Sequence, residues 1–200
     1  MRKIIYLISP NKISKNFYIN LDKVLAFGNT AFFQLRLKNE KKNKILKIAK
    51  KIKKITKKHR VKLLINDNLS LALNIKADGC HLGQQDGSFE IAKKKLNKKI
   101  FGITCHNSKV LAKSALKFNP SYLAFGSFYK SKLKPNTFKA NISILKWAKK
   151  NIKKPIVAIG GINSNNYKKL LLNKANLLAI SSYIWKNKKL KPSDAIKKFK

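Results

Sequence analysis

Acidic residues, cysteine and long apolar runs are all scarce in this chain of 200 residues. Only two cysteines occur, Cys80 and Cys105, which are too few for a disulfide framework and favour a reducing compartment. No apolar run approaches the roughly 20 residues that a membrane-spanning helix needs. The basic start "MRKIIYLISP" has no small-residue cleavage site and is expected to be a first strand. We therefore predict a cytoplasmic protein without a membrane partner.

Arginine is almost absent, although the chain is very basic. Lys and Arg total 47 against 7 Asp and Glu, a formal net charge of +40, and Arg stands only at positions 2, 36 and 60. A basic excess can indicate nucleic-acid binding, but recognition of phosphates and base edges usually favours Arg over Lys. The lysines are spread along the whole chain, as in compositional drift. We expect no specific nucleic-acid partner, and keep a basic nucleic-acid-binding protein as an alternative from another functional class.

Short apolar runs alternate with longer amphipathic segments, and this alternation predicts a parallel sheet with right-handed crossovers. Helices are expected, for example, at 41–58, 107–118, 141–151 and 164–173. Eight strand–helix units predict one (β/α)8 barrel domain spanning residues 1–200, with its active site at the carboxyl ends of the strands. An open doubly wound sheet is the competing fold. The expected strands are 3–9, 31–37, 61–66, 77–82, 99–104, 121–126, 154–160 and 176–181.

The second expected strand contains an unusual polar row. Gln34, Arg36 and Lys38 alternate with large apolar residues in "FFQLRLKN", so the two sets must face opposite sides of the strand. In a barrel the apolar set would pack outward under helices, and the polar set would point toward the axis. Buried cations need an anion to offset their desolvation. Because acidic residues are scarce, a bound phosphate is the expected counterion.

Two aspartates follow adjacent strands of the expected barrel. Asp67 ends "IND" and Asp86 ends "HLGQQD". A pair of carboxylates, completed by water and phosphate oxygens, is a common arrangement for Mg²⁺. Alternatively, each aspartate could cap the helix that follows it, although Ser88 could replace Asp86 in that role.

Two further strand ends offer backbone N–H groups that could bind phosphate. The stretch "GGI" at 160–162 follows the seventh strand, and "SSY" at 181–183 follows the eighth. A tight turn is the alternative interpretation of the paired glycines. Cys105 and His106 are adjacent and should face opposite sides of their strand, which disfavours a nucleophile–base pair. His81 and His106 could line the barrel mouth or be structural, and no Cys/His spacing resembles a zinc site.

Taken in order, these segments resemble the motif set of thiamine-phosphate synthases over nearly the whole chain. The motifs are "QLRLK" (34–38), "IND" (65–67), "ADGCHLGQQD" (77–86), "GITCHN" (102–107), "SKLK" (131–134), "AIGGI" (158–162) and "AISSYI" (179–184). The resemblance implies a (β/α)8 barrel. It also implies an enzyme, a transferase that couples 4-amino-2-methyl-5-hydroxymethylpyrimidine diphosphate to thiazole phosphate with release of pyrophosphate and with Mg²⁺ as cofactor.

The resemblance also assigns roles to individual residues. It implies that Asp67 and Asp86 bind Mg²⁺ and that Arg36, Lys38 and Lys134 stabilise the leaving diphosphate. The substrate-binding residues that it implies are Gln34, Arg36, Lys38, Asn66, Thr104, Ser131, Leu133, Lys134, Gly161, Ser181 and Ser182.

The chain departs from the family pattern at several positions, and two of these departures remove a functional group that the family usually has. Asn68 stands where the family usually has Arg, and Leu133 replaces the second Thr of a "T-x-T" motif. The related thiazole tautomerase is the alternative activity within the superfamily, since it shares the barrel and a His near position 106. It requires proton transfer and no Mg²⁺, so the paired aspartates favour the synthase.

Overall fold

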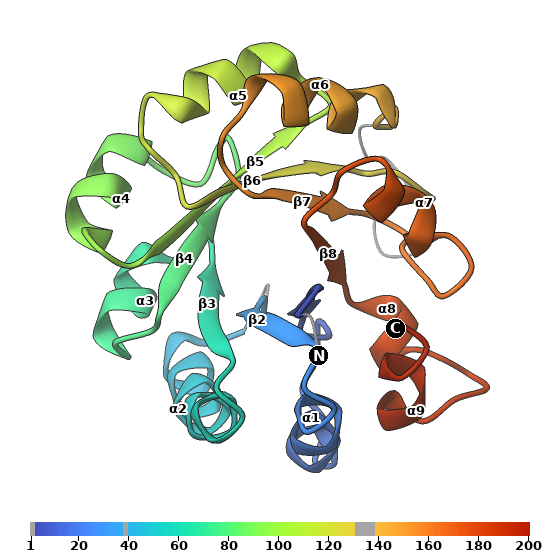
Figure 1. Ribbon diagram of the computed structural model, residues 1–200. Coiled ribbons are helices and arrows are strands. Elements are labelled where there is room, and N and C mark those ends of the chain that lie inside the picture. The colour runs from blue at the N-terminus through green and yellow to red at the C-terminus, as the bar shows by residue number, and fades with distance from the viewer. Residues whose placement is uncertain (1–2, 38–39, 131–138) are drawn as a thin grey trace.

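Eight parallel strands form a closed barrel within the part of the chain that the structure, a computed structural model, describes: residues 3–37, 40–130 and 139–200. Each strand pairs with its neighbours in chain order, and β1 pairs with β8 to close the sheet. The predicted (β/α)8 architecture is confirmed, and the open sheet is wrong (Figure 1). The strands are β1 (Ile5–Ile8), β2 (Thr30–Leu35), β3 (Lys62–Asn66), β4 (Gly79–Leu82), β5 (Ile100–His106), β6 (Tyr122–Gly126), β7 (Ile156–Ile159) and β8 (Leu177–Ile180).

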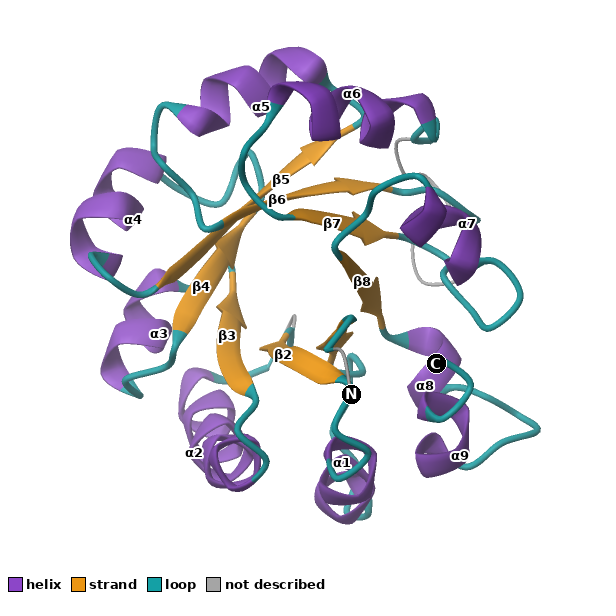
Figure 2. Cartoon of the chain, in the orientation of Figure 1, coloured by secondary structure: helices purple, strands orange, loops and turns teal. Residues whose placement is uncertain are grey.

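Helices surround the barrel on its outer side, as Figure 2 shows. They are α1 (Phe17–Leu25), α2 (Lys42–Lys58), α3 (Leu69–Asn74), α4 (Phe89–Leu96), α5 (Lys109–Leu116), α6 (Ser143–Asn151), α7 (Tyr167–Leu172), α8 (Ser182–Trp185) and α9 (Pro192–Ile196). The helix expected at 164–173 begins later, because asparagines fold the preceding segment into turns. In these turns Asn163 Oδ1 accepts from the Asn165 N–H at 2.9 Å, and Asn166 Oδ1 accepts from the Asn163 N–H at 2.9 Å.

Alternation along the strands separates an outer core from the barrel interior. Phe33 and Leu35 of β2 are buried in the outer core under the helices, as predicted. The outer core also contains Cys80 and Cys105. The interior set includes Tyr6, Ile8, Leu64, Tyr122, Ala124, Val157, Leu177 and Ala179, with Phe32, Ile100 and Ile159 packed against them.

The interior is more polar and aromatic than the usual branched aliphatic filling of such barrels. Tyr6 and Tyr122 are 1% exposed, and their rings pack edge to face with centroids 5.6 Å apart. Gly102 of β5 makes room for Tyr122, since a Cβ there would lie 2.0 Å from that ring. A side chain at position 102 would therefore displace the phenol from the axis.

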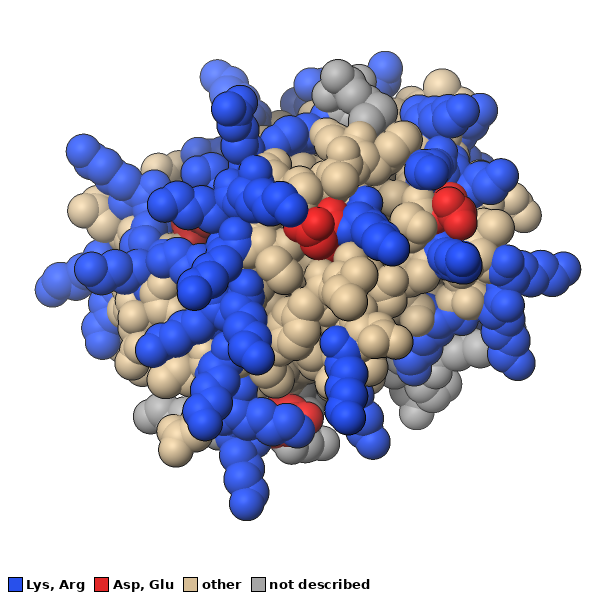
Figure 3. All heavy atoms as spheres, turned by 90° about the horizontal axis from the view of Figure 1, so that it is seen from below, with Lys and Arg blue, Asp and Glu red and all other residues tan. Residues whose placement is uncertain are grey.

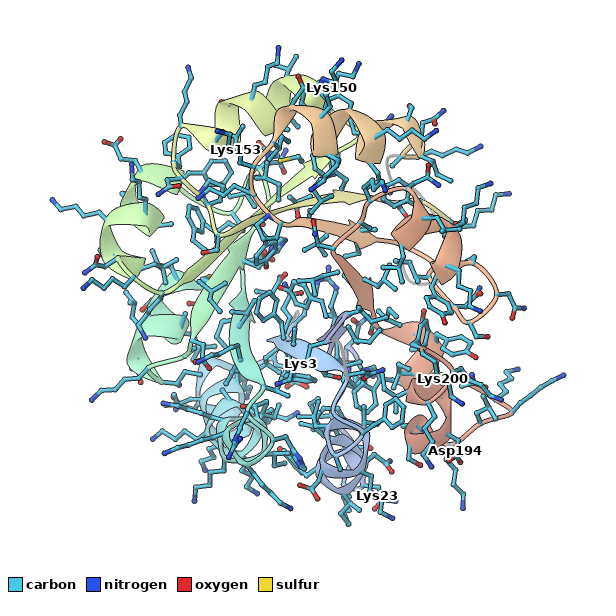
Figure 4. The ribbon with its side chains drawn as sticks, viewed as in Figure 1. Lys3, Lys23, Lys150, Lys153, Asp194 and Lys200 are labelled. Carbon is cyan, nitrogen blue, oxygen red and sulfur yellow. The ribbon has the colours of Figure 1, made fainter. Side chains whose placement is uncertain are left out.

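Lysines project outward from the helices and loops around the barrel. Figure 3 shows them scattered over one face of the molecule, with isolated acidic residues between them. Lys150 on α6 and Lys153 just after α6 are exposed on the opposite side of the barrel from Lys23 on α1, which is also exposed (Figure 4). Among the described residues, none of the helices combines the length and apolar character required to cross a bilayer.

Candidate active site at the barrel mouth

The first member of the predicted polar row, Gln34, enters the barrel as expected. Gln34 is 3% exposed, and its Nε2 donates to Tyr6 Oη at 2.8 Å. Arg36 follows β2 and is partly buried, with its backbone N–H donating to Ser9 Oγ at 2.9 Å. Its guanidinium helps to lower the pKa of His81 on β4, so the cation acts on the interior. Lys38 lies outside the described residues.

The two aspartates line one cleft at the carboxyl ends of β3 and β4. Its volume is about 490 Å³, and Asp67 and Asp86 contribute to its wall together with Asn68, Leu69, Leu82, Gly87, Ser88 and Ile91. Both carboxylates also contribute to the raised pKa of the Cys80 thiol, behind burial as the main cause. The chain therefore brings together two carboxylates that are 19 positions apart in a protein with few of them.

Neither aspartate has the capping role that was the alternative interpretation. Asn68 caps α3, because its Oδ1 accepts from the Leu71 N–H at 2.8 Å. Ser88 caps α4 by accepting from the Ile91 N–H at 3.2 Å. Asp86 instead accepts from the Gly83 N–H at 2.8 Å within its own loop. The caps leave both carboxylates in the wall of the cleft.

A pair of carboxylates is better suited to binding Mg²⁺ together with a substrate than to forming a metal site made of protein ligands alone. Mg²⁺ usually keeps several waters and binds through one or two carboxylates together with substrate phosphates. The described residues contain no group of three or more His, Cys, Asp or Glu side chains that could hold a metal ion. The donor set in the cleft is thus of the kind that a phosphorylated substrate would complete.

His81 and Thr104 belong to the barrel interior just below the mouth. His81 Nε2 lies 2.8 Å from Thr104 Oγ1, and His81 Nδ1 lies 2.8 Å from Tyr122 Oη. Burial lowers the pKa of the His81 imidazole to about 4, opposed by Asp86 and reinforced by Arg36. The imidazole is therefore neutral near pH 7.

Asn66 ends β3 on the inward side, and its register partner on β4 is His81. It is partly buried, as are Thr104 and His106 on β5. The candidate pyrimidine-side residues Gln34, Asn66 and Thr104 therefore come from strands 2, 3 and 5 and face a common interior.

The neighbouring ends of β7 and β8 form the opposite part of the mouth. Gly160 and Gly161 follow β7 with φ of +107° and +60°, a left-handed backbone that suits glycine. Ser181 and Ser182 follow β8, and Ser181 Oγ donates to the Ser9 carbonyl at 3.1 Å. The paired glycines thus lie in a tight turn, and the two loops are adjacent because their strands pair.

The cysteines are structural. Cys80 and Cys105 are 0% exposed in the outer core, and burial is the main reason that the pKa of each thiol is raised to about 12. Both thiols stay protonated near pH 7, which excludes them as nucleophiles. Ser131, Leu133 and Lys134, the other residues expected at the site, lie outside the described residues.

The sequence analysis missed the interior tyrosines. Tyr6 and Tyr122 stand in expected strands, at inward positions where the other residues are mostly aliphatic, and a phenol there was the available signal. Ser9 was missed as well, although its Oγ accepts from the Arg36 N–H and donates to the Arg36 carbonyl at 3.3 Å. This contact fixes the backbone at the residue expected to bind diphosphate.

Comparisons with a family model and with individual known proteins point to the same kind of enzyme. Residues 5–184 match the family model described as "Thiamine monophosphate synthase". The thiamine-phosphate synthase of Pelagibacter ubique is 57% identical over 200 residues, covering 100% of this chain and 97% of that protein. The thiamine-phosphate synthase of Erythrobacter litoralis is 36% identical over 186 residues, covering 90% of this chain and 87% of that protein.

A solved structure shares the architecture. The thiamine phosphate pyrophosphorylase from Pyrococcus furiosus superposes with a TM-score of 0.87 at 25% sequence identity. The alignment covers 98% of this chain and 93% of that chain. The similarity therefore includes the whole barrel.

Proposed function

Since this chain belongs to the thiamine monophosphate synthase family, we propose that it couples 4-amino-2-methyl-5-hydroxymethylpyrimidine diphosphate to thiazole phosphate. The family places it among the transferases of thiamine biosynthesis. In the proposed reaction, the bond between the exocyclic methylene carbon of the pyrimidine and the diphosphate oxygen breaks. The thiazole nitrogen then bonds to that carbon, and pyrophosphate leaves with the electron pair.

The cleft that Asp67 and Asp86 line carries the proposal. Its two carboxylates would suit a Mg²⁺ ion, and the diphosphate and water could supply the remaining ligands. When bound, Mg²⁺ supplies positive charge that stabilises the leaving diphosphate. The tautomerase needs no such pair, so the same cleft favours the synthase.

Arg36 would bind the diphosphate from the β2 side. It sits at the end of a strand whose polar face enters the barrel, and its backbone is held by Ser9. Arg can donate two parallel hydrogen bonds to a phosphate. Lys38 and Lys134 are proposed to add charge, on the resemblance alone.

The reaction needs no strong general base at this mouth. The electron-rich pyrimidine stabilises a carbocation, so the rate depends on leaving-group stabilisation and on placing the thiazole nitrogen. The residues agree with that requirement, because burial lowers the pKa of His81 and so makes it a weak base, and both thiols stay protonated. The proposed step is a dissociative substitution.

The β7 and β8 loops would hold the thiazole phosphate. Gly161, Ser181 and Ser182 stand at the ends of adjacent strands, opposite the carboxylate cleft. Tyr183 Oη donates to Ser164 Oγ at 2.9 Å and ties the two loops together. Ser131 and Leu133 are proposed beside this phosphate on the resemblance alone.

The decisive experiment measures product formation from the two substrates. Thiamine phosphate and pyrophosphate should appear in equal amounts, require both substrates and stop when EDTA removes the metal. A reaction mixture without thiazole phosphate is the control for simple hydrolysis. Absence of thiamine phosphate, with isomerisation of a thiazole carboxylate phosphate instead, would move the assignment to the tautomerase.

A further inference from the structure

A continuous chain of hydrogen bonds crosses the barrel interior from β2 to β5. Gln34 Nε2 donates to Tyr6 Oη at 2.8 Å, and Tyr6 Oη lies 2.7 Å from Tyr122 Oη. Tyr122 Oη lies 2.8 Å from His81 Nδ1, and His81 Nε2 lies 2.8 Å from Thr104 Oγ1. We call these five residues the interior relay. Its two ends are residues expected to bind the pyrimidine diphosphate.

The relay is tightly packed as well as hydrogen-bonded. The rings of His81 and Tyr122 stack with an interplanar angle of 9° and centroids 5.6 Å apart, and Phe32 also stacks on Tyr122, with centroids 5.8 Å apart. Gly102 leaves the space that the Tyr122 phenol occupies. Burying polar groups costs free energy unless every partner is present, and aliphatic side chains would fill a barrel without that requirement. A stable interior alone does not call for the relay.

Counting hydrogens gives the relay one direction. Because Gln34 donates to Tyr6, the Tyr6 hydroxyl can donate its own hydrogen bond to Tyr122 Oη, and the Tyr122 hydroxyl can donate to His81 Nδ1. His81 then carries its hydrogen on Nε2 and donates to Thr104 Oγ1. In the opposite direction Tyr6 would accept from both neighbours, and no contact in the described residues provides an acceptor for its own hydroxyl hydrogen.

The direction has a consequence at the mouth. Thr104 Oγ1 is occupied as an acceptor by His81, so its hydroxyl hydrogen is available to an acceptor of a bound ligand. Gln34 is held through its amide nitrogen, which fixes the plane of the amide. The same relay therefore sets the hydrogen-bonding character of two groups on opposite sides of the axis.

We propose that the interior relay positions Gln34 and Thr104 for the pyrimidine diphosphate, with Tyr6, Tyr122 and His81 as positioning residues. The proposal rests on the proposed function for the identity of that ligand. It makes Thr104 a donor, which suits an acceptor-rich substrate such as a diphosphate. Reversing the relay would leave His81 Nε2 without a hydrogen, so Thr104 would donate its hydroxyl hydrogen to His81 and could no longer donate it to the ligand.

The first experiment needs no substrate. Nitrogen-15 NMR of the imidazoles, assigned by loss of the His81 signals in His81→Gln, should show the Nε2–H tautomer of His81 in the wild type. Gln34→Glu, measured at alkaline pH so that the new carboxylate accepts from Tyr6, should reverse the relay and give the Nδ1–H tautomer. An Nδ1–H tautomer in the wild type, or an unchanged tautomer in folded Gln34→Glu, would overturn the proposal.

The second experiment uses kinetics and a matched control. Tyr122→Phe keeps the ring but removes the central hydroxyl, and should lower kcat/KM for the pyrimidine diphosphate about tenfold, as for loss of one buried hydrogen bond. The KM for thiazole phosphate should not change. Tyr167→Phe is the control, since Tyr167 is 2% exposed and its hydroxyl donates to the Lys200 carbonyl at 2.9 Å in the outer core.

The outcomes separate the relay from the proposed function. Equal loss for both substrates, or the same loss in Tyr167→Phe, would reduce the relay to a structural role and overturn the proposal. Tautomer reversal in Gln34→Glu would support the relay even if the wild type formed no thiamine phosphate. That last result would count against the proposed function alone.

Discussion

Asp67 adopts a backbone conformation that few aspartates adopt, with a φ of +62°. A residue other than glycine in the left-handed region costs roughly 1–2 kcal/mol, although aspartate tolerates it better than most. The next residue, Asn68, caps α3, so the turn from β3 into α3 is made by two consecutive polar residues. Asp67 thus lines the cleft from a left-handed backbone conformation, directly before the residue that caps α3.

The carboxylate charges of the cleft are testable one residue at a time. Asp67→Asn and Asp86→Asn keep size and should lower turnover by orders of magnitude, because each removes half of the proposed Mg²⁺ ligand pair. The folded state should persist, since neither carboxylate caps a helix. The measurement is the rate of pyrophosphate release as a function of Mg²⁺ concentration.

Asp194→Asn is the matched control for that experiment. Asp194 pairs with Lys197 at 3.6 Å on the surface, and its side chain is 48% exposed. This variant should keep the wild-type rate and Mg²⁺ dependence. Wild-type activity at low Mg²⁺ in either cleft variant would refute the assignment of the metal ligands.

At the scale of elements, β2 shows what alternation alone could predict. Its period of two correctly separated Phe33 and Leu35, under the helices, from Gln34, in the interior. The order of strands and helices likewise predicted the closed barrel. These features are local in sequence, so they can be read from one segment at a time.

The interior relay could not be predicted in the same way. Its five members come from five different strands, and their contacts depend on how the side chains of a closed barrel meet at the axis. The cap of α3 was equally hidden, because nothing in the segment shows that Asn68, and not Asp67, accepts from the Leu71 N–H. Pairing across strands is a tertiary property that one segment does not encode.

The helix start at α3 makes the departure at Asn68 testable. Asn68→Arg should raise kcat/KM at low pyrimidine diphosphate if a cation is missing beside Asp67. It should also lower the free energy of unfolding by about 0.5–2 kcal/mol, because arginine cannot replace the cap on the Leu71 N–H. Steady-state kinetics and denaturant unfolding measure the two effects.

Asn68→Ala separates the charge from the cap. It loses the same hydrogen bond without adding a cation, so it should be similarly destabilised with no gain in kcat/KM. If the Arg and Ala variants have equal kcat/KM, another cation already serves the diphosphate and the departure has no functional cost.

The contact between α1 and the end of α2 predicts a pH effect. Asp22 Oδ1 lies 2.8 Å from His59 Nε2 and 2.9 Å from Lys58 Nζ, and these hydrogen bonds, His59 first, lower the pKa of Asp22 from 3.8. A lowered carboxyl pKa stabilises the fold fully above pH 3.8, and the contribution disappears as pH falls through the lower folded value.

Removing this charge should therefore matter at neutral pH and cease to matter in acid. Asp22→Asn should lower the free energy of unfolding by about 1 kcal/mol or less at pH 7, because the contact is largely exposed to solvent. The difference from the wild type should shrink below pH 3.8. Urea unfolding at several pH values measures it, and a difference that grew in acid would contradict the assignment.

At the scale of the whole molecule, positive charge exceeds what the acidic residues can neutralise. Within the part of the chain that the structure describes, Asp22, Glu40, Asp78 and Asp194 form ion pairs on the surface. The net charge of +40 leaves most lysines without an acidic partner. A strongly positive field raises the rate at which anionic ligands meet the protein. Both proposed substrates are phosphorylated, so the field favours their encounter without selecting between them.

Lysines also surround a second cavity, away from the carboxylates. It has a volume of about 200 Å³ and lies at the amino-terminal end of the barrel, between the loops that lead into β5 and β6. Lys93, Lys98, Lys99 and Lys154 contribute to its wall. Lys99 Nζ already donates to the Ala77 carbonyl at 2.7 Å, so part of this charge is used within the fold.

Diffuse charge of this kind predicts DNA binding that is weak and indifferent to sequence. Such binding comes from release of counterions, so its affinity should fall steeply as salt rises. Fluorescence anisotropy with two duplexes of unrelated sequence, titrated at several NaCl concentrations, should give equal affinities and equal salt slopes. Because the charge is spread over the molecule, replacing Lys93, Lys98 and Lys154 together by Gln should have a small effect. The number of phosphate contacts inferred from the salt slope should fall by at most about three. Sequence-selective, submicromolar binding at physiological salt would instead make the lysines a recognition surface and overturn the interpretation of the charge as compositional drift.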